Sequence, residues 1–314
     1  LGFDNPAKAL LKTTKEAVDN SLDACEDAGI LPDISVTIAA LNNGSERFRV
    51  TVKDNGPGIV KAQIPKSFAK LLYGSKFHTL KQARGQQGIG ISAAGMYGQL
   101  TTGAPIRIRS RTKASLPVNC YSLRIDTEKN NPEILSETTG EEEGWDHGTE
   151  VTIDLEATYR HGAQSVETYI EQTVVANPHA TVRFAGPEGD PVTYVRTTND
   201  LPPEAQEMKP HPSGVELGML LRIFQAARGT TVKAALQSSF SRVSPNVAAE
   251  IREKAGLPDT LRTSRITPEQ VEAVYRAIRE VKIMAPPSSS VVPIGEDLII
   301  EGLKRRFEAD FYFS

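Results

Sequence analysis

Two stretches of alternating apolar and polar residues constrain the fold more than any other feature of the chain. Residues 34–41 (ISVTIAAL) and 48–54 (FRVTVKD) have the period of half-buried strands, and the polar segment NNGSE between them is typical of a hairpin turn. A helix precedes this hairpin, because Asn5 and Pro6 form a capping start and Gly29 is a natural stop. Its predicted apolar stripe consists of Leu11, Val18, Leu22 and Cys25.

The rest of the first two hundred residues continues this mixture of helices and strands. Strand patterns recur at 105–111, 119–126 and 149–155, a further hairpin is predicted at 181–198, and helical patterns cover 62–73, 165–177 and the residues from about 90. Helices mixed with antiparallel hairpins favour an α+β fold over a doubly wound sheet. The α+β domain is expected to cover residues 1–205.

A proline-rich segment separates this domain from a helical one. Residues 196–213 contain four prolines and are predicted to be a linker. From residue 206 to 285 the pattern is helical. One helix starts at Ser244-Pro245 and stops at Gly256, and another starts at Thr267 with Gln270 completing a capping box. A second break then precedes residues 286–314, which begin a segment that the chain does not finish.

The lengths of the apolar runs and the number of cysteines indicate the cellular compartment. No apolar run approaches the roughly 20 residues that span a bilayer. The chain has two cysteines, Cys25 and Cys120, which is too few for a disulfide framework and indicates reduced core residues. We therefore expect a cytoplasmic protein. The first residue is Leu1 rather than Met, which suggests that the chain is part of a longer protein.

Two polar positions on the first helix have two interpretations. Glu16 and Asn20 are four residues apart and share one helix face, roughly opposite the apolar stripe. Periodicity alone predicts a solvated face. The alternative is a cleft, in which the carboxylate activates a water and the amide oxygen binds Mg²⁺.

The second strand places a carboxylate on its buried side. The alternation that points Phe48, Val50 and Val52 inward also points Asp54 inward, and an unpaired buried carboxylate costs several kcal/mol, in the range of about 2–7 kcal/mol for a polar group alone. Asp54 can either close a turn with the backbone of the following NGPG segment or form the floor of a pocket that binds an exocyclic amine. In the second case Gly56 and Gly58 leave room for a flat ring. Thr149, on the strand at 149–155, also faces inward.

The third feature is the glycine-rich segment RGQQGIGISAAG at residues 84–95. Its spacing matches neither a Walker loop nor a dinucleotide-binding loop, so by itself it predicts either a tight turn or a close approach of backbone to a ligand.

Taken in order, the segments EAVDNSLDA, DNGPGI, GQQGIGISAAG and GTEV resemble the four nucleotide-binding boxes of the GHKL ATPases, a family of gyrase-type topoisomerases, a heat-shock chaperone, sensor histidine kinases and mismatch-repair ATPases. The helical segment 244–278 resembles a helix–two-turn–helix module, and its position after the ATPase domain is similar to that in the B subunits of archaeal type IIB topoisomerases. The resemblance implies a GHKL-type sandwich of helices on a mixed, mostly antiparallel sheet at 1–205, a helix–two-turn–helix domain at 206–285 and the beginning of a transducer domain at 286–314.

The resemblance also implies a role for each matching residue. Glu16 is the general base for the attacking water, Asn20 is the Mg²⁺ ligand, and Asp54 recognises adenine with help from Thr149 through a water. Ser75 and Lys76 match the lid of the family, and Lys76 adds charge at the phosphates. The backbone N–H groups that hold the ATP phosphates are those of Arg84, Gly85, Gln86, Gln87, Gly88, Ile89, Gly90 and Ile91.

At the level of the assembly, the resemblance implies an ATP-hydrolysing B subunit. ATP and Mg²⁺ binding dimerises two B subunits into a gate for double-stranded DNA, and an A subunit cleaves the duplex within an A2B2 heterotetramer to relax supercoils. Such a protein is cytoplasmic and nucleoid-associated, with no membrane partner. Alternatives are a GHKL ATPase of the chaperone or mismatch-repair type, and a DNA-binding scaffold with an inactive nucleotide fold.

The helical segment has a modest basic bias. Residues 211–285 contain 11 Lys or Arg and 7 Asp or Glu, a net charge of +4 that favours contact with a polyanion such as DNA. The candidate contacts are Arg252, Lys254, Arg262 and Arg265. The alternative is that these side chains form an ordinary solvated surface.

Overall fold

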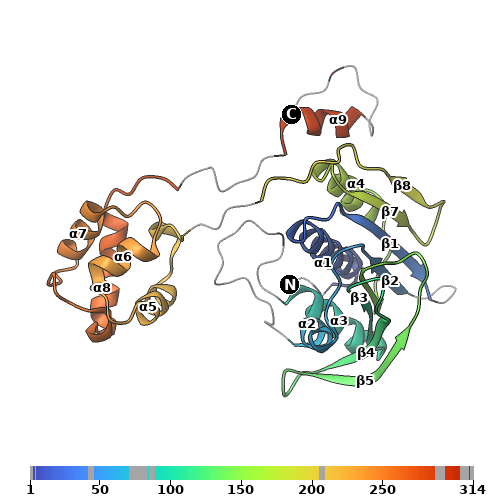
Figure 1. Cartoon of the computed structure of the whole chain (residues 1–314), viewed down its shortest axis with the longest axis horizontal. Helices are drawn as coiled ribbons and strands as arrows, with labels where there is room; N and C mark the ends of the chain where they lie inside the picture. Colours follow the sequence, from blue (N-terminus) through green and yellow to red (C-terminus); the bar gives the residue numbers. More distant parts are fainter. Residues whose placement is uncertain are drawn as a thin grey trace. The chain divides into compact units, whose positions relative to one another are not determined.

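The computed structural model describes residues 3, 5–41, 46–70, 84, 89–204, 209–286, 294–304 and 311. Its first compact unit, which takes in the described residues up to 204 together with 294–304, is built on one eight-stranded sheet in the order β5-β4-β3-β6-β2-β1-β7-β8 (Figure 1). The strands are β1 (Asp33–Ala40), β2 (Arg47–Lys53), β3 (Ile106–Arg111), β4 (Val118–Asp126), β5 (Asn131–Gly140), β6 (Gly148–Glu156), β7 (Thr181–Ala185) and β8 (Val192–Tyr194).

The first hairpin has the predicted form. β1 and β2 pair antiparallel with Val36 opposite Val52 and Ile38 opposite Val50. β1 also pairs in parallel with β7, and every other pairing among the described strands is antiparallel. The sheet is therefore mixed and mostly antiparallel, which confirms the α+β prediction.

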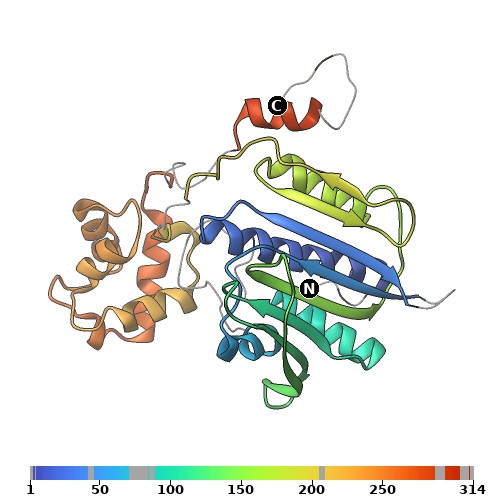
Figure 2. The same ribbon diagram turned by 45° about the vertical axis from the view of Figure 1, so that its right-hand side comes forward.

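Four helices cover one face of the sheet (Figures 1 and 2). They are α1 (Pro6–Asp27), α2 (Ile64–Ala69), α3 (Gly90–Thr102) and α4 (Val166–Ala176). All four contribute buried side chains to one hydrophobic core with the inward residues of the strands. α1 begins as predicted, because the Asn5 side chain accepts a hydrogen bond from the N–H of Ala7 at 2.9 Å. Val18, Leu22 and Cys25 are buried as predicted, whereas Leu11 is only half-buried.

The opposite face of the sheet is polar, which completes a two-layer structure. Arg49 on β2 binds both carboxylate oxygens of Asp154 on β6, at 2.8 and 2.9 Å, and Arg107 on β3 binds the same group at 2.8 Å. Next to this cluster the hydroxyls of Thr51 and Thr152 lie 3.1 Å apart. Because these polar and charged side chains pair across three strands and are compatible with water, this face needs no covering layer of helices.

The strand β5 has no signature in the sequence. It forms one edge of the sheet, and nearly all of its residues are exposed. A strand with solvent on both faces has no alternating pattern, so its residues look like a polar loop. Cys120, on the neighbouring β4, is half-buried rather than a core residue, while Cys25 is buried as expected.

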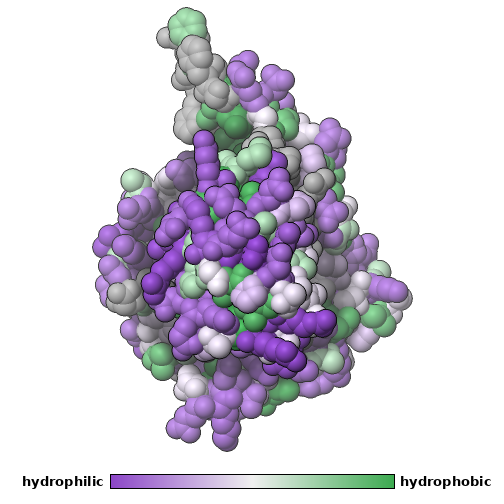
Figure 3. All heavy atoms as spheres, turned by 90° about the vertical axis from the view of Figure 1, so that its left-hand side faces the viewer, coloured by the Kyte–Doolittle hydropathy of each residue, from purple (hydrophilic) through white to green (hydrophobic). Residues whose placement is uncertain are grey.

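The second compact unit, described for residues 209–286, is helical. It contains α5 (Leu217–Ala226), α6 (Val232–Ser239), α7 (Pro245–Lys254) and α8 (Pro268–Glu280), with its own apolar core. The predicted capping box is present: the side chain of Thr267 accepts from the N–H of Gln270, and the Gln270 side chain accepts from the N–H of Thr267. The surface of this unit is largely hydrophilic (Figure 3).

One more helix, α9 (Glu296–Lys304), belongs to the first unit. It packs against α4, where Gly302 lies so close that a Cβ there would be 3.6 Å from the Cα of Val175. The predicted transducer domain at 286–314 is not tested by this contact. Among the helices of the described residues, none combines the length and apolar character that crossing a membrane requires.

Candidate functional site

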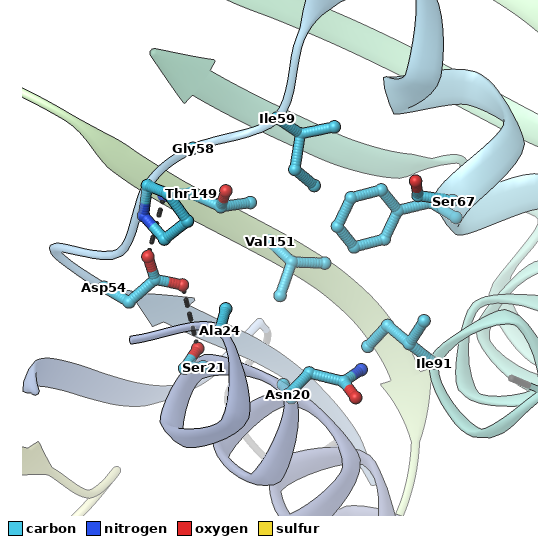
Figure 4. A pocket seen from close by; sticks show the side chains of 13 residues that line it. Asn20, Ser21, Ala24, Asp54, Gly58, Ile59, Ser67, Ile91, Thr149 and Val151 are labelled. Atoms are coloured by element: carbon cyan, nitrogen blue, oxygen red, sulfur yellow. Dashed lines mark hydrogen bonds between the residues drawn. The ribbon is translucent and has the colours of Figure 1, made fainter. Parts of the chain in front are cut away.

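A pocket of about 200 Å³ lies between α1, the loop after β2, α2, the start of α3 and β6 (Figure 4). Its walls are mostly apolar, and the polar side chain at its floor is the carboxylate of Asp54. The volume is below the roughly 300 Å³ at which pockets for whole drug-sized ligands begin, so it suits one flat part of a larger ligand. The lining residues are Ala17, Asn20, Ser21, Ala24, Asp54, Pro57, Gly58, Ile59, Ser67, Phe68, Ile91, Thr149 and Val151.

Asp54 follows β2 directly and has a side chain that hydrogen bonds hold in place. Its Oδ1 accepts from the N–H groups of Gly56 at 2.8 Å and Thr149 at 3.0 Å. Its Oδ2 accepts from the hydroxyl of Ser21 on α1 at 2.9 Å (Figure 4). Oδ1 therefore closes a turn with Gly56 while the carboxylate also lines a pocket, and binding of an exocyclic amine there stays a prediction.

Burial decides the electrostatics of this carboxylate. Asp54 is 7% exposed, and its loss of hydration raises the pKa of the carboxyl above its usual value. The hydrogen bonds from Gly56, Thr149 and Ser21 oppose the rise because they favour the charged form. A carboxylate has about four acceptor sites, and three donors leave capacity for one more. A ligand with an N–H or amino donor at one edge would use it.

The two glycines of the DNGPG segment serve the packing of the protein itself. Gly58 has a φ of +68°, and a Cβ there would lie 2.0 Å from the carbonyl oxygen of Arg111 on β3. A Cβ at Gly56 would lie 3.0 Å from Oδ1 of Asp54 and 3.4 Å from Sγ of Cys25. Each glycine permits a close approach between protein atoms, and of the two Gly58 also lines the pocket. That they leave room for a flat ring stays a prediction.

Glu16 and Asn20 lie on the side of α1 that faces the site. Asn20 is exposed and lines the pocket, as a cleft requires, and its binding of Mg²⁺ stays a prediction. Glu16 is half-buried against Gly90, the first residue of α3, where a Cβ would lie 1.8 Å from its Oε2. Burial, followed by the charge of Asp19, raises the pKa of Glu16, while Lys15 and Lys12 act in the opposite direction. A raised pKa suits a carboxylate that accepts a proton near neutral pH.

The glycine-rich segment is described at both of its ends. Ile89 precedes α3, Gly90 begins it, and Ile91 is buried and lines the pocket. Other predicted positions, namely Ser75, Lys76, Gly85, Gln86, Gln87 and Gly88, lie outside the described residues.

Arg84 points away from the expected phosphate role. Its backbone N–H and its guanidinium both bind the carboxylate of Asp23, and the guanidinium also binds Glu26 at 2.7 and 2.8 Å. Glu26 in turn lies 2.8 Å from Nε2 of His179, and hydrogen bonds from His179 and Arg84 hold the pKa of Glu26 low against the effect of its burial. In this structure Arg84 therefore ties the start of the glycine-rich segment to α1, instead of offering its N–H to a ligand.

Thr149 contacts Asp54 directly. Its backbone N–H donates to the carboxylate and its carbonyl accepts from the N–H of Asp54 at 2.9 Å, while its hydroxyl lies 3.0 Å from that of Ser110. The expected water-mediated role of the hydroxyl is not tested. Ser21 is a site residue that the sequence motifs miss, although the small residues Ala17, Ser21 and Ala24 recur at helical spacing and indicate a helix face that something approaches closely.

The residues present fit a purine base and a Mg²⁺ ion. Apolar walls beside the buried carboxylate of Asp54 match a flat ring with an amino group at its edge. Within the described ranges no three His, Cys, Asp or Glu side chains form a metal cluster. Mg²⁺ does not require one, because it commonly keeps several waters and takes one or two protein ligands plus substrate phosphates. Asn20 is placed to be such a ligand.

In the helical unit, three of the four side chains predicted to contact DNA form hydrogen bonds within the protein. The Arg252 side chain is 14% exposed, and it binds Asp259 at 3.0 Å and the carbonyl of Leu257 at 2.8 Å, so it has a structural role in this unit. Its contact with DNA stays a prediction. Lys254 donates to the carbonyl of Glu280 at 3.0 Å and Arg262 to that of Gly229 at 3.2 Å. Arg265 is exposed.

Comparisons with known proteins identify the family of the chain. Residues 5–159 match the family model described as histidine kinase-, DNA gyrase B- and HSP90-like ATPase. The chain is 47% identical over 314 residues to the B subunit of type 2 DNA topoisomerase 6 from Methanococcoides burtonii, a match that covers 99% of this chain and 50% of that protein. The protein of the same name from Archaeoglobus fulgidus is 43% identical over 316 residues, with 100% and 52% covered.

A third relative of the same name, from Natronomonas pharaonis, is 50% identical over 250 residues, with 79% of this chain and 30% of that protein covered. The chain thus spans about half the length of the first two relatives. It belongs to the family of the type 2 DNA topoisomerase 6 B subunits, and it carries a histidine kinase-, DNA gyrase B- and HSP90-like ATPase domain.

Proposed function

We propose that this chain is the ATP-binding and ATP-hydrolysing part of the B subunit of a type IIB DNA topoisomerase. The observation that carries the proposal is the buried carboxylate of Asp54 at the floor of an apolar pocket, which opens toward Asn20 and the start of α3. A pocket with one open carboxylate acceptor selects a ring with an exocyclic amine, as adenine has.

Recognition of the base and the chemical step use different parts of the site. Oδ2 of Asp54 accepts from the adenine amine, while Ile59, Phe68 and Val151 contact the faces and edge of the ring. The phosphates then extend toward the start of α3, where the free N–H groups of a helix N-terminus favour negative charge. The backbone of residues 85–91 and the side chains of Ser75 and Lys76 are proposed as the phosphate contacts, with Arg84 as a tether and not a donor.

Glu16 lies next to Gly90, at the same end of α3, and is proposed as the general base. Its raised pKa allows it to take a proton from water as the water attacks the γ-phosphate. Asn20 would hold Mg²⁺, which offsets the charge of the phosphates when bound. Because Glu16 and Asn20 are one turn apart on α1, the base and the metal ligand share one rigid element.

The wider assembly is part of the proposal. ATP binding dimerises two B subunits, and an A subunit cleaves and reseals the duplex within an A2B2 complex, so that supercoiled DNA is relaxed in the cytoplasm, at the nucleoid. The helical unit is proposed to be a helix–two-turn–helix domain that contacts DNA phosphates, and residues 286–314 to begin a transducer domain. A chaperone or mismatch-repair ATPase would share the pocket, but the relatives that match across both units of this chain are named as topoisomerase subunits.

The test combines binding with reconstitution. ATP is titrated into the full-length B subunit in a calorimeter, and relaxation of supercoiled plasmid is followed after a matching A subunit is added, with and without ATP. Relaxation that needs both subunits and ATP, and is lost in Glu16→Gln while ATP binding persists, supports the proposal. ATP binding without any ATP-dependent relaxation would favour another GHKL ATPase, and no ATP binding would refute the nucleotide site itself.

A further inference from the structure

The turn that carries Asp54 is held from behind by a loop that does not line the pocket. This loop follows β5 and leads into β6, and it contains Trp145 and His147. The indole Nε1–H of Trp145 donates to the main-chain carbonyl of Asp54 at 3.1 Å. Nδ1 of His147 lies 2.7 Å from the carbonyl of Gly56, and since a carbonyl only accepts, Nδ1 must carry the proton. Side chains of this loop thus bind two carbonyls of one turn.

The position of the Trp145 ring is itself tightly defined. The residue is 6% exposed, with Nζ of Lys53 4.3 Å from the ring centroid and Cζ of Arg109 5.6 Å from it. Both cations also bind Glu142, at the start of the same loop. Cations over an indole face attract the ring, so Trp145 is held between the charged face of the sheet and the Asp54 turn.

Gly148 makes the approach of the indole possible. Its φ is +140°, and a Cβ there would lie 2.0 Å from the carbonyl oxygen of Asp54 and 2.7 Å from Nε1 of Trp145. Any larger residue would separate the two groups. The guanidinium of Arg111 adds a further restraint, because it donates to the carbonyl of Trp145 at 3.1 Å.

The anchored carbonyl controls where the carboxylate points. The carbonyl of Asp54 belongs to the Asp54–Asn55 peptide, and the next peptide in the turn carries the N–H of Gly56, which donates to Oδ1 at 2.8 Å. If the Asp54–Asn55 peptide turns, it displaces the peptide that follows it, so the N–H of Gly56 moves and Oδ1 loses one of its two donors. The free acceptor of Oδ2 would then no longer face the ring edge at a defined angle.

We propose that Trp145 is a positioning residue, supported by His147, which fixes the Asp54 turn and thereby sets the preference for adenine over guanine nucleotides. The inference rests on the proposed nucleotide function. Guanine has a carbonyl where adenine has its amine, so a rigid carboxylate repels it, and a loosened one discriminates less.

The experiment uses Trp145→Phe in the full-length B subunit, which keeps an aromatic ring but has no N–H donor. Tyr97→Phe is the matched control, because it also removes one donor to a main-chain carbonyl, that of Glu156, at the far end of the same domain. Calorimetry gives the ATP and GTP affinities, and steady-state hydrolysis gives KM and kcat.

For Trp145→Phe we expect the ATP Kd and KM to rise about tenfold, the effect of about 1.4 kcal/mol, with kcat within about twofold because Glu16 is untouched. GTP binding should change little, so the ATP-to-GTP preference falls. Tyr97→Phe should leave that preference intact. His147→Ala, at a half-buried position, should shift it in the same direction and serves if Trp145→Phe does not fold.

An unchanged preference in the Trp145 or the His147 variant, or an equal loss in Tyr97→Phe, would overturn the positioning role while the nucleotide site stands. If the wild type binds no ATP, the proposed function fails together with this inference. The two failures are therefore distinguishable.

Discussion

Replacement of Asp54 by asparagine is the sharpest test of how the pocket selects its ligand. The amide oxygen can take the place of Oδ1 and accept from the N–H groups of Gly56 and Thr149. The amide nitrogen then replaces Oδ2, and the hydroxyl of Ser21 can rotate to accept from it. The internal hydrogen bonds survive, but the pocket now presents a donor to the donor of adenine.

The expected loss follows from the bonds involved. A hydrogen bond to a charged acceptor contributes about 1.5–3 kcal/mol, so the ATP Kd should rise about 10- to 150-fold. The free energy of unfolding should change little or increase, because a buried charge is removed while its partners remain satisfied.

Asp154 provides a matched control. It is also 7% exposed, and it lies on the opposite face of the sheet in ion pairs with Arg49 and Arg107. Asp154→Asn should lower the free energy of unfolding and leave the ATP Kd unchanged, the reverse of the pattern at Asp54. Calorimetric titration with ATP and urea denaturation of both variants measure the two quantities. An ATP Kd in Asp54→Asn within about twofold of wild type would refute the role of this carboxylate.

The two carboxylates also differ in the sign of their pH dependence. Burial raises the folded-state pKa of Asp54, so its contribution to stability is present below the unfolded pKa and is lost as pH rises through the raised value. For Asp154, burial is outweighed by the hydrogen bonds to Arg49 and Arg107, and its pKa is lowered. Its contribution is present above the unfolded pKa and is lost as pH falls through the lowered value. In a plot of the free energy of unfolding against pH, Asp54→Asn should remove the decrease toward high pH, and Asp154→Asn should remove the decrease toward low pH.

Further predictions concern the chemical step, the metal and DNA. Glu16→Gln should retain ATP binding and reduce hydrolysis about 10²- to 10⁴-fold, and in the wild type the raised pKa of Glu16 should move the acid limb of kcat to higher pH; equal hydrolysis rates would exclude Glu16 as the base. Asn20→Ala should weaken the Mg²⁺ dependence of ATP binding, and an unaltered Mg²⁺ titration would assign the ligand elsewhere. Arg265→Glu should lower the log–log salt slope of DNA binding by about 0.9 for a lost phosphate contact, whereas a parallel salt series would point to a structural role for the helical unit.

The structural features that can be predicted from this sequence are those that depend on residues close together in the chain. The alternation through Phe48, Val50 and Val52 is enough to place Asp54 inward, because a strand turns each side chain through the same half-turn. The capping box at Thr267 can likewise be predicted from the sequence, because it involves two residues only three positions apart. In both cases the deciding interaction is local.

Contacts between distant residues are not predictable in this way. Trp145 lies 91 positions from Asp54 in the chain, and nothing in its own neighbourhood indicates which carbonyl its indole binds. The glycine-rich motif predicts that Arg84 belongs to a phosphate loop. Its guanidinium instead binds Asp23 and Glu26 on α1, which the motif does not indicate. The motif around Gly58 indicates a ligand contact, although the backbone of Arg111 is what excludes a side chain there. A motif identifies residue types, but the tertiary packing determines which neighbouring groups those residues contact.

The arrangement of the site separates binding from chemistry. Asp54 is fixed by β2, by β6, by the loop that carries Trp145 and by one hydrogen bond from Ser21 of α1. Glu16 and Asn20 both belong to α1, and Glu16 meets the start of α3. A change on the sheet side should therefore alter KM and base preference, and a change on the helix side should alter hydrolysis. The proposed gate would close on ATP binding and reopen after hydrolysis, so the two events must be distinct. Different residues of this site, Asp54 for binding and Glu16 for hydrolysis, would provide that distinction.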